Sequence, residues 1–234
     1  MRVALSLIAT LSPTAAFAQA AQCDIPRVLP RPRPDLPSAS QPKRIEPIGG
    51  YTLALIWQPR HCVQGVPGAS DMRCDGASAK RGFTLHGLWP DGEGDSWPQY
   101  CRATDILPPA TLRAHYCATP SAQLLQHEWA KHGTCVAPTP AAYFGKSAAL
   151  YRALRFPDMR AIARRGPITA GALAGLIAKA NRGMRADMLR ITASRDNWLQ
   201  EVWVCLDKSL RYARCRAGSG GLPMRAKIKV TPPL

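Results

Sequence analysis

Apolar side chains gather in four short segments that have the character of β-strands. Residues 51–57 and 82–89 are rich in aliphatic and aromatic side chains and are bounded by proline and glycine, which mark strand ends. Residues 188–193 and 199–206 have the same composition near the other end of the chain. We therefore predict two early strands and two late strands.

Between these two pairs of strands, apolar positions recur at helical spacing. Thr169 is a suitable N-cap for the last predicted helix, and Asn181 with Gly183 marks its end. Helices between strands predict an α+β fold in which helices flank a central antiparallel sheet. The predicted helices cover residues 109–117, 121–132, 141–155, 157–164 and 169–181.

The segment before the first strand differs from the rest of the chain. It is rich in proline and charge and lacks apolar periodicity, so we predict an extended arm over residues 19–49. Residues 50–234 are long enough for one compact domain with a substantial core. No internal repeat is apparent.

The first residues have the pattern of a signal peptide. Arg2 is followed by an apolar run, and small residues then precede a predicted cleavage after Ala18, with Ala20 as the alternative. The signal peptide is thus predicted over residues 1–18, and we expect a periplasmic or secreted protein. No other stretch is long and apolar enough to span a membrane.

The chain is strongly basic, with 31 Lys and Arg against 15 Asp and Glu and a formal charge of +16. Ten basic residues lie between Tyr151 and Arg195, where only Asp158 and Asp187 oppose them. Such an excess attracts polyanions without sequence preference. Charge alone fits RNA, DNA, anionic lipid and heparin-like polymers equally well, and it also fits a solvated surface without a partner.

Two histidine segments narrow this choice. The segments are FTLHGLWP at residues 83–90 and HEWAKHGTC at residues 127–135. On an α-helix, the polar residues His127, Glu128, Lys131 and His132 would share a face about 140° wide. Metal-free RNA cleavage needs one imidazole as base, another as acid, and cations for the phosphate, and these segments supply most of these groups.

Both segments resemble the active-site segments of the ribonuclease T2 family, and strand-like segments at 52–59 and 202–207 resemble its first core strand and a late strand. The resemblance spans roughly residues 50–215. It implies a ribonuclease T2-like, disulfide-stapled fold and metal-independent, low-specificity cleavage of single-stranded RNA. Attack of the 2′-oxygen would give a 2′,3′-cyclic phosphate and a 5′-hydroxyl, with no cofactor.

The resemblance also implies roles for individual residues. Carried over by position, neutral His132 is the base and protonated His86 the acid, which predicts a bell-shaped pH profile. Glu128 and Lys131 assist at the transition state, and His127 binds phosphate.

Three further side chains are expected to bind the substrate. In the family, the tryptophan at the position of Trp89 stacks on a base; core packing is the alternative role. Asp91 and Trp97 stand where relatives carry an acid and an aromatic residue for base recognition.

Eight cysteines are typical of a disulfide framework, for which 105 pairings exist. Metal binding is disfavoured because the chain has no Cys-x-x-Cys pair. A zinc-protease site is disfavoured because His127 and His132 are five residues apart, whereas that motif needs histidines four apart. The resemblance together with the spacing favours the pairs Cys101–Cys135, Cys62–Cys74, Cys205–Cys215 and Cys23–Cys117.

Two other functions fit the same features. The protein could be a secreted polyanion-binding factor in which RNA cleavage is secondary, or a toxin that uses RNA cleavage as its weapon. We expect a monomer that takes single-stranded RNA as its substrate.

Overall fold

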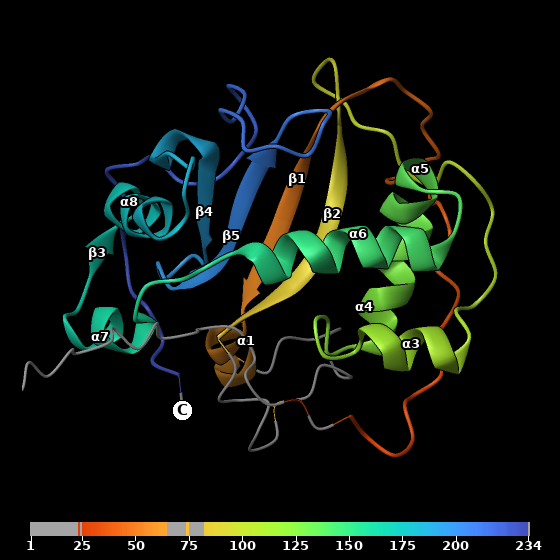
Figure 1. Cartoon of the computed structure of the whole chain (residues 1–234), viewed down its shortest axis with the longest axis horizontal. Helices are drawn as coiled ribbons and strands as arrows, with labels where there is room; N and C mark the ends of the chain where they lie inside the picture. The colour runs from red at the N-terminus through yellow and green to blue at the C-terminus, as the bar shows by residue number, and fades with distance from the viewer. Residues whose placement is uncertain (1–22, 24, 65–73, 75–81, 234) are drawn as a thin grey trace, which may run out of the picture.

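A four-stranded antiparallel sheet forms the centre of the protein (Figure 1). The computed structural model describes residues 23, 25–64, 74 and 82–233. The strand order is β2-β1-β5-β4, so the two early strands and the two late strands lie side by side. The predicted α+β class is confirmed. The strands are β1 (Ile48–Trp57), β2 (Phe83–Gly92), β4 (Leu189–Ala193) and β5 (Leu199–Leu206).

The strand register gives the sheet one apolar face and one mixed face. Leu53 of β1 is paired with Leu88 of β2 and Val204 of β5, and all three side chains are buried in the core. Their neighbours along each strand point to the other face, because side chains alternate across a sheet. That second face carries Trp89 and Trp203 and forms the floor of the site described below.

Helices cover the apolar face and the edge of β2. Helix α6 runs across the sheet in Figure 1, and its Tyr143, Phe144 and Tyr151 join the hydrophobic core. The other elements are α1 (Gln58–Gln64), α3 (Pro109–His115), α4 (Ala122–His127), the π-helical turn η1 (Glu128–Gly133), α5 (Thr134–Val136), α6 (Pro140–Ala153), α7 (Met159–Arg164), β3 (Ile168–Thr169), α8 (Ala170–Ala180), the 3-10 turn η2 (Ala186–Met188) and β6 (Lys227–Ile228).

The free edge of β2 is satisfied by side chains and loops rather than by another strand. The Leu88 N–H donates to the Tyr143 hydroxyl at 3.2 Å, and the same hydroxyl lies 3.1 Å from the Leu88 carbonyl oxygen. The carbonyl of Leu85 accepts from the Thr119 hydroxyl at 2.8 Å. These bonds cap the edge and hold α6 and the loop before α4 against it.

The helix predictions were correct in position and incomplete in detail. Ser121 and Thr169 cap α4 and α8 through their hydroxyls, because each accepts from a backbone N–H three residues later. The single helix predicted over 121–132 is instead α4 followed by η1. Helix α1 and the short β3–β6 pair were not predicted.

The described part of the N-terminal segment, residues 25–47, runs along the body of the protein. The backbone of Arg33 exchanges two hydrogen bonds with the side-chain amide of Gln123, and Arg44 forms a β-bridge with Gln99. The predicted signal peptide over 1–18 lies outside the described residues. Within the described chain, no helix has the length and apolar character that a membrane crossing requires.

All eight cysteines are paired, and the pairs are those that the resemblance favoured. Cys23–Cys117 attaches the start of the arm to the end of the α3 region, and Cys101–Cys135 joins a loop to α5, directly after η1. Cys62–Cys74 and Cys205–Cys215 close shorter loops.

Replacing both Cys101 and Cys135 by serine should lower the free energy of unfolding by about 2–4 kcal/mol, because the bridge closes a loop of 34 residues. RNA cleavage, the activity expected from the sequence, should also fall, because α5 continues the turn that carries His132. Denaturant unfolding and turnover on RNA measure the two effects. The matched control is the Cys205/Cys215 double serine variant, whose loop spans only 10 residues. Full turnover in the Cys101/Cys135 variant would contradict the link to the site.

Candidate active site

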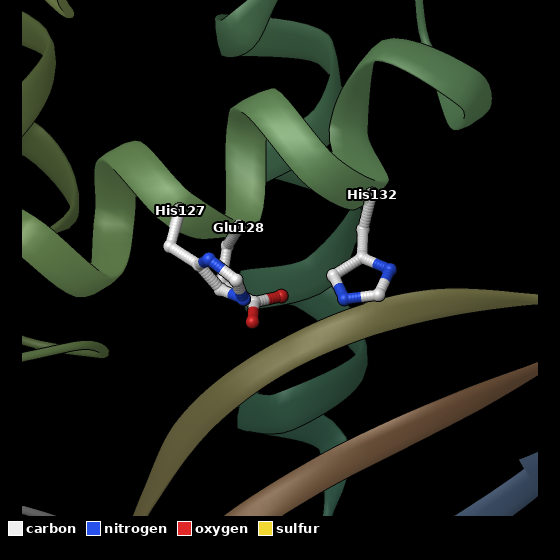
Figure 2. Close-up of side chains that lie close together, drawn as sticks. All are labelled: His127, Glu128 and His132. Carbon is white, nitrogen blue, oxygen red and sulfur yellow. The ribbon is translucent and has the colours of Figure 1, made fainter. Parts of the chain in front are cut away.

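A π-helical turn presents three polar side chains on one side of the helix. His127 ends α4, and Glu128 and His132 belong to η1. Because a π-helix bonds residue i to residue i+5, side chains five apart face the same way. The rings of His127 and His132 accordingly lie 6.0 Å apart, centroid to centroid, and Figure 2 shows both pointing toward β2 with Glu128.

A β-bulge in β2 directs His86, the histidine of the first motif, toward this turn. Leu55 pairs with Leu85 and Ala54 pairs with Gly87, so His86 is an extra residue in the ladder. The bulge changes the alternation of side chains and brings His86 and Trp89 together, with ring centroids 4.9 Å apart. Without the bulge, residues three apart would point to opposite faces of the strand.

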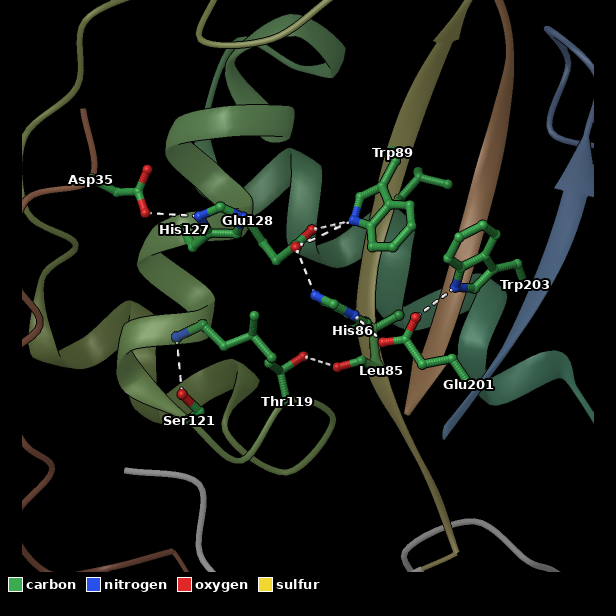
Figure 3. A network of polar contacts seen from close by, with 12 residues as sticks. Asp35, Leu85, His86, Trp89, Thr119, Ser121, His127, Glu128, Glu201 and Trp203 are labelled. Atoms are coloured by element: carbon green, nitrogen blue, oxygen red, sulfur yellow. Dashed lines mark hydrogen bonds and ion pairs between the residues drawn. The ribbon is translucent and has the colours of Figure 1, made fainter. Parts of the chain in front are cut away.

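The Glu128 carboxylate is the junction between helix and strand (Figure 3). It is buried and accepts hydrogen bonds from the indole N–H of Trp89 at 3.0 Å and from the Tyr143 hydroxyl at 3.2 Å. Nε2 of His86 lies 3.5 Å from its second oxygen. Space for the carboxylate comes from Gly87, where an added Cβ would lie 1.6 Å from a Glu128 oxygen.

The three imidazoles differ in what their Nδ1 atoms contact. Nδ1 of His86 lies 2.6 Å from a Glu201 oxygen, and Nδ1 of His127 lies 2.7 Å from an Asp35 oxygen. Nδ1 of His132 is buried and has no hydrogen-bond partner among the described residues. Two of the rings thus have an anionic partner, and His132 has none.

This difference sets opposite pKa shifts. Burial acts to lower the pKa of His86, but the charge and hydrogen bond of Glu201, with help from Glu128, leave it above its ordinary value. Burial, followed by the charges of Lys131 and the other two histidines, holds the pKa of His132 well below its ordinary value. The two shifts therefore favour the protonated form of His86 and the neutral form of His132.

Burial also shifts the two other ionisable groups of η1. It raises the pKa of Glu128 against the opposing effect of His86, and it lowers the pKa of Lys131 against the effect of Glu128. A buried carboxylate that is bonded to Trp89 and Tyr143 is held in one position. Lys131 adds a cation beside the imidazoles.

The same turn could bind a metal ion. Ligand atoms of His127, Glu128 and His132 all lie within 4.8 Å of one another. A spacing of five residues disfavours a shared zinc ion on an α-helix, but the π-turn brings residues five apart together. The neighbouring Lys131 opposes a second cation electrostatically. The prediction that the site works without metal remains a prediction.

Comparison with known proteins identifies the family. Residues 48–215 match the sequence profile of the ribonuclease T2 family. The chain belongs to the ribonuclease T2 family. A probable ribonuclease of Haemophilus influenzae is 31% identical in an alignment of 183 residues that covers 73% of this chain and 62% of that protein. A ribonuclease of Aeromonas hydrophila is 31% identical over 68% of this chain and 71% of its own length.

The fold of this ribonuclease T2 family member is also that of solved structures. RNase NT, crystallised with 5′-AMP, superposes with a TM-score of 0.62 at 20% sequence identity, covering 81% of this chain and all of that chain. The matched part of the present chain spans less than two thirds of the Haemophilus relative. The profile match shows the family, and the superposition shows the fold.

The substrate-binding residues predicted for this ribonuclease T2 family member lie in two places. Trp89 packs against His132 and Trp203, with centroids 5.6 and 5.5 Å away, so it belongs to the histidine cluster. Asp91 instead accepts from Thr52, and Trp97 donates to Gln99 and stacks under Arg44. Among the described residues, no hydrogen bond, ion pair or ring contact joins Asp91 or Trp97 directly to the histidines.

Three residues of the site were not predicted from the sequence. Glu201 had a detectable signal, since it is the only charged residue of a mostly apolar strand. Asp35 and Tyr143 had none, because an aspartate in a proline-rich segment and a tyrosine in a helix are ordinary. Their roles depend on contacts that span 92 and 15 residues of sequence.

Replacing Gly87 by alanine should displace the Glu128 carboxylate, because the added methyl group occupies its position. We expect kcat on RNA to fall on the order of 10- to 100-fold, as a displacement of about 1 Å can do. Circular dichroism should show an intact fold. Gly94→Ala is the matched control, since a Cβ there meets nothing within 4 Å. Equal kcat values in the two variants would refute the assigned role of Gly87.

Replacing Glu201 by glutamine should lower the pKa of His86, because the anion that raises it is lost. If His86 acts when protonated, the alkaline limb of the pH–rate profile should move to lower pH. The acid limb, which His132 would set, should stay in place and serves as the internal control. A parallel shift of both limbs, or of neither, would count against the assignment.

Proposed function

We propose that this protein is an exported endoribonuclease that cleaves single-stranded RNA with low base specificity and without metal. The observation that carries the proposal is the pair of imidazoles with opposite pKa shifts, His86 and His132, whose ring centroids lie 4.9 and 5.6 Å from that of Trp89. Acid–base catalysis of transphosphorylation needs one protonated and one neutral histidine at the same pH.

In the proposed reaction, neutral His132 takes the proton from the ribose 2′-hydroxyl. The 2′-oxygen attacks phosphorus, the bond from phosphorus to the 5′-oxygen breaks, and Nε2 of His86 protonates the leaving oxygen. The products are a 2′,3′-cyclic phosphate and a free 5′-hydroxyl. The 2′-hydroxyl is the nucleophile, so DNA is not a substrate.

The residues around the two imidazoles would stabilise the phosphate charge and orient the rings. Lys131 offsets the charge that develops on the nonbridging oxygens, and His127 binds the phosphate. Glu128 holds Trp89 in place and carries a negative charge beside Nε2 of His86, which keeps a proton on that nitrogen. Glu201 fixes the ring by accepting from Nδ1–H, because its own pKa stays low enough for it to be ionised.

The residues proposed to recognise a base include two that lie away from the histidines. Trp89 offers a face for stacking, and Asp91 with Trp97 would contact a base further along β2 and the loop that follows. Asp91 lies five residues from His86, which is about 17 Å along an extended strand. Loose base selection is consistent with stacking, since every base has a π-face.

Export and charge complete the proposal. The signal-like N-terminus and four disulfides are typical of a periplasmic or secreted protein. The formal charge of +16 attracts the RNA backbone, and the protein would act as a monomer. A toxin would use the same chemistry. A polyanion-binding protein would not cleave RNA.

The test is incubation of the oxidised protein with a single-stranded RNA oligonucleotide and its 2′-deoxy counterpart, in EDTA, with mass analysis of the ends. We expect cyclic phosphate ends from RNA alone. His86→Ala and His132→Ala should each lower kcat about 10²- to 10⁴-fold. His115→Ala is the matched control, because that ring packs on Phe144.

Two outcomes would overturn the proposal. Loss of cleavage in EDTA that added Zn²⁺ restores would point to a metal ion bound by η1. Intact RNA with a full set of disulfides, confirmed by thiol counting, would favour a binding protein.

A further inference from the structure

A residue outside the family match contributes to the active site. The match begins at residue 48, and Asp35 lies before it in the N-terminal arm. One oxygen of the Asp35 carboxylate lies 2.7 Å from Nδ1 of His127, and the other accepts from the Tyr100 hydroxyl at 2.6 Å (Figure 3 shows the contact with His127). Both carboxylate oxygens are therefore engaged at the edge of η1.

The position of Asp35 is well defined by its surroundings. Its side chain is 18% exposed, and that of His127 is 28% exposed. Tyr100 is buried with φ of 51°, a left-handed conformation that a non-glycine residue adopts only when its surroundings hold it. Its N–H donates to the carbonyl of Lys131 at 2.8 Å. Tyr100 thus joins Asp35 to the turn that carries the site.

The protonation states of this group follow from its contacts. Burial acts to raise the pKa of Asp35, but its hydrogen bonds to His127 and Tyr100 hold it below its ordinary value. Burial and the Asp35 carboxylate raise the pKa of Tyr100, so its phenol stays protonated and donates. An ionised carboxylate can only accept hydrogen bonds. Nδ1 of His127 must therefore carry the proton in this contact.

The arm is fastened on both sides of Asp35. Before it, Cys23 is bonded to Cys117, and the backbone of Arg33 exchanges hydrogen bonds of 2.9 and 3.2 Å with Gln123. After it, the β-bridge between Arg44 and Gln99 fixes the chain again. Asp35 is held at the site by contacts that do not involve His127.

We infer that Asp35 is a positioning residue for the proposed reaction: it holds the imidazole of His127 with Nδ1–H toward the arm and Nε2 toward the substrate phosphate. The inference rests on the proposed function. A carboxylate on the far nitrogen of a working histidine fixes the tautomer and the ring orientation, as it does for histidines that bind metals. The arm thereby becomes part of the active site.

The geometry also allows Asp35 to oppose substrate binding, and the experiment distinguishes this effect from positioning. A carboxylate close to Lys131 and His127 could compete with the substrate phosphate for both cations. If it did, removal of Asp35 would lower KM and raise kcat/KM. The inference requires the reverse.

The first experiment is a double-mutant cycle on the full chain. Asp35→Ala should lower kcat/KM on an RNA oligonucleotide on the order of 10- to 100-fold, which is typical when such a partner is lost. Asp35→Asn should retain part of the activity, because its amide oxygen still accepts from Nδ1–H. In the His127→Ala background, Asp35→Ala should change kcat/KM by less than about twofold, since the two act as one unit.

The second readout does not depend on activity. Nitrogen-15 NMR of the histidine rings should show Nδ1 of His127 protonated in the wild type, and a changed tautomer population in Asp35→Ala. Glu46→Ala is the matched control, because that arm carboxylate bonds to Ser96 and not to the site. It should leave both readouts unchanged.

Three results would overturn the inference. They are an unchanged or raised kcat/KM in Asp35→Ala, an equal loss in the wild-type and His127→Ala backgrounds, and an unchanged tautomer of His127. If the wild-type protein cleaves no RNA, the proposed function fails, and the NMR measurement still tests the contact between Asp35 and His127.

Discussion

The buried Glu128 carboxylate is the constraint on which the geometry of the site depends. A charge removed from water is costly unless it is well hydrogen-bonded, and Glu128 has donors from two different elements, Trp89 of β2 and Tyr143 of α6. Both must be in place at once, so the turn, the strand and the helix are fixed relative to one another. Gly87 makes this approach possible because a side chain there would occupy the same space.

The chemistry depends on the different surroundings of similar rings. His86 and His127 each have a carboxylate on Nδ1, from Glu201 and Asp35, and His132 has no partner there among the described residues. A carboxylate stabilises the protonated ring, whereas burial beside cations favours the neutral ring. The fold therefore gives two residues of the same type, His86 and His132, opposite pKa shifts.

Both histidine segments contain an irregularity of one residue. The β-bulge at His86 changes which face of β2 the ring occupies, and the π-turn of η1 aligns His127 with His132. Each irregularity departs from a regular hydrogen-bond ladder and costs stability locally. The bonds that cap the edge of β2, from Tyr143 and Thr119, hold the two segments together in spite of that cost.

The sequence by itself determined the strands, most of the helices, the family and the identity of the residues in its two motifs, because these depend on local periodicity and on residue type. Tertiary structure alone decided the contacts, the orientations and the pKa shifts of those residues. Glu201 and Asp35 reach their histidines across 115 and 92 residues, and no local pattern shows which histidine each carboxylate contacts. The bulge and the π-turn depend on pairing with β1 and on packing against α6. Burial sets the pKa shifts, and burial exists only once the chain has folded.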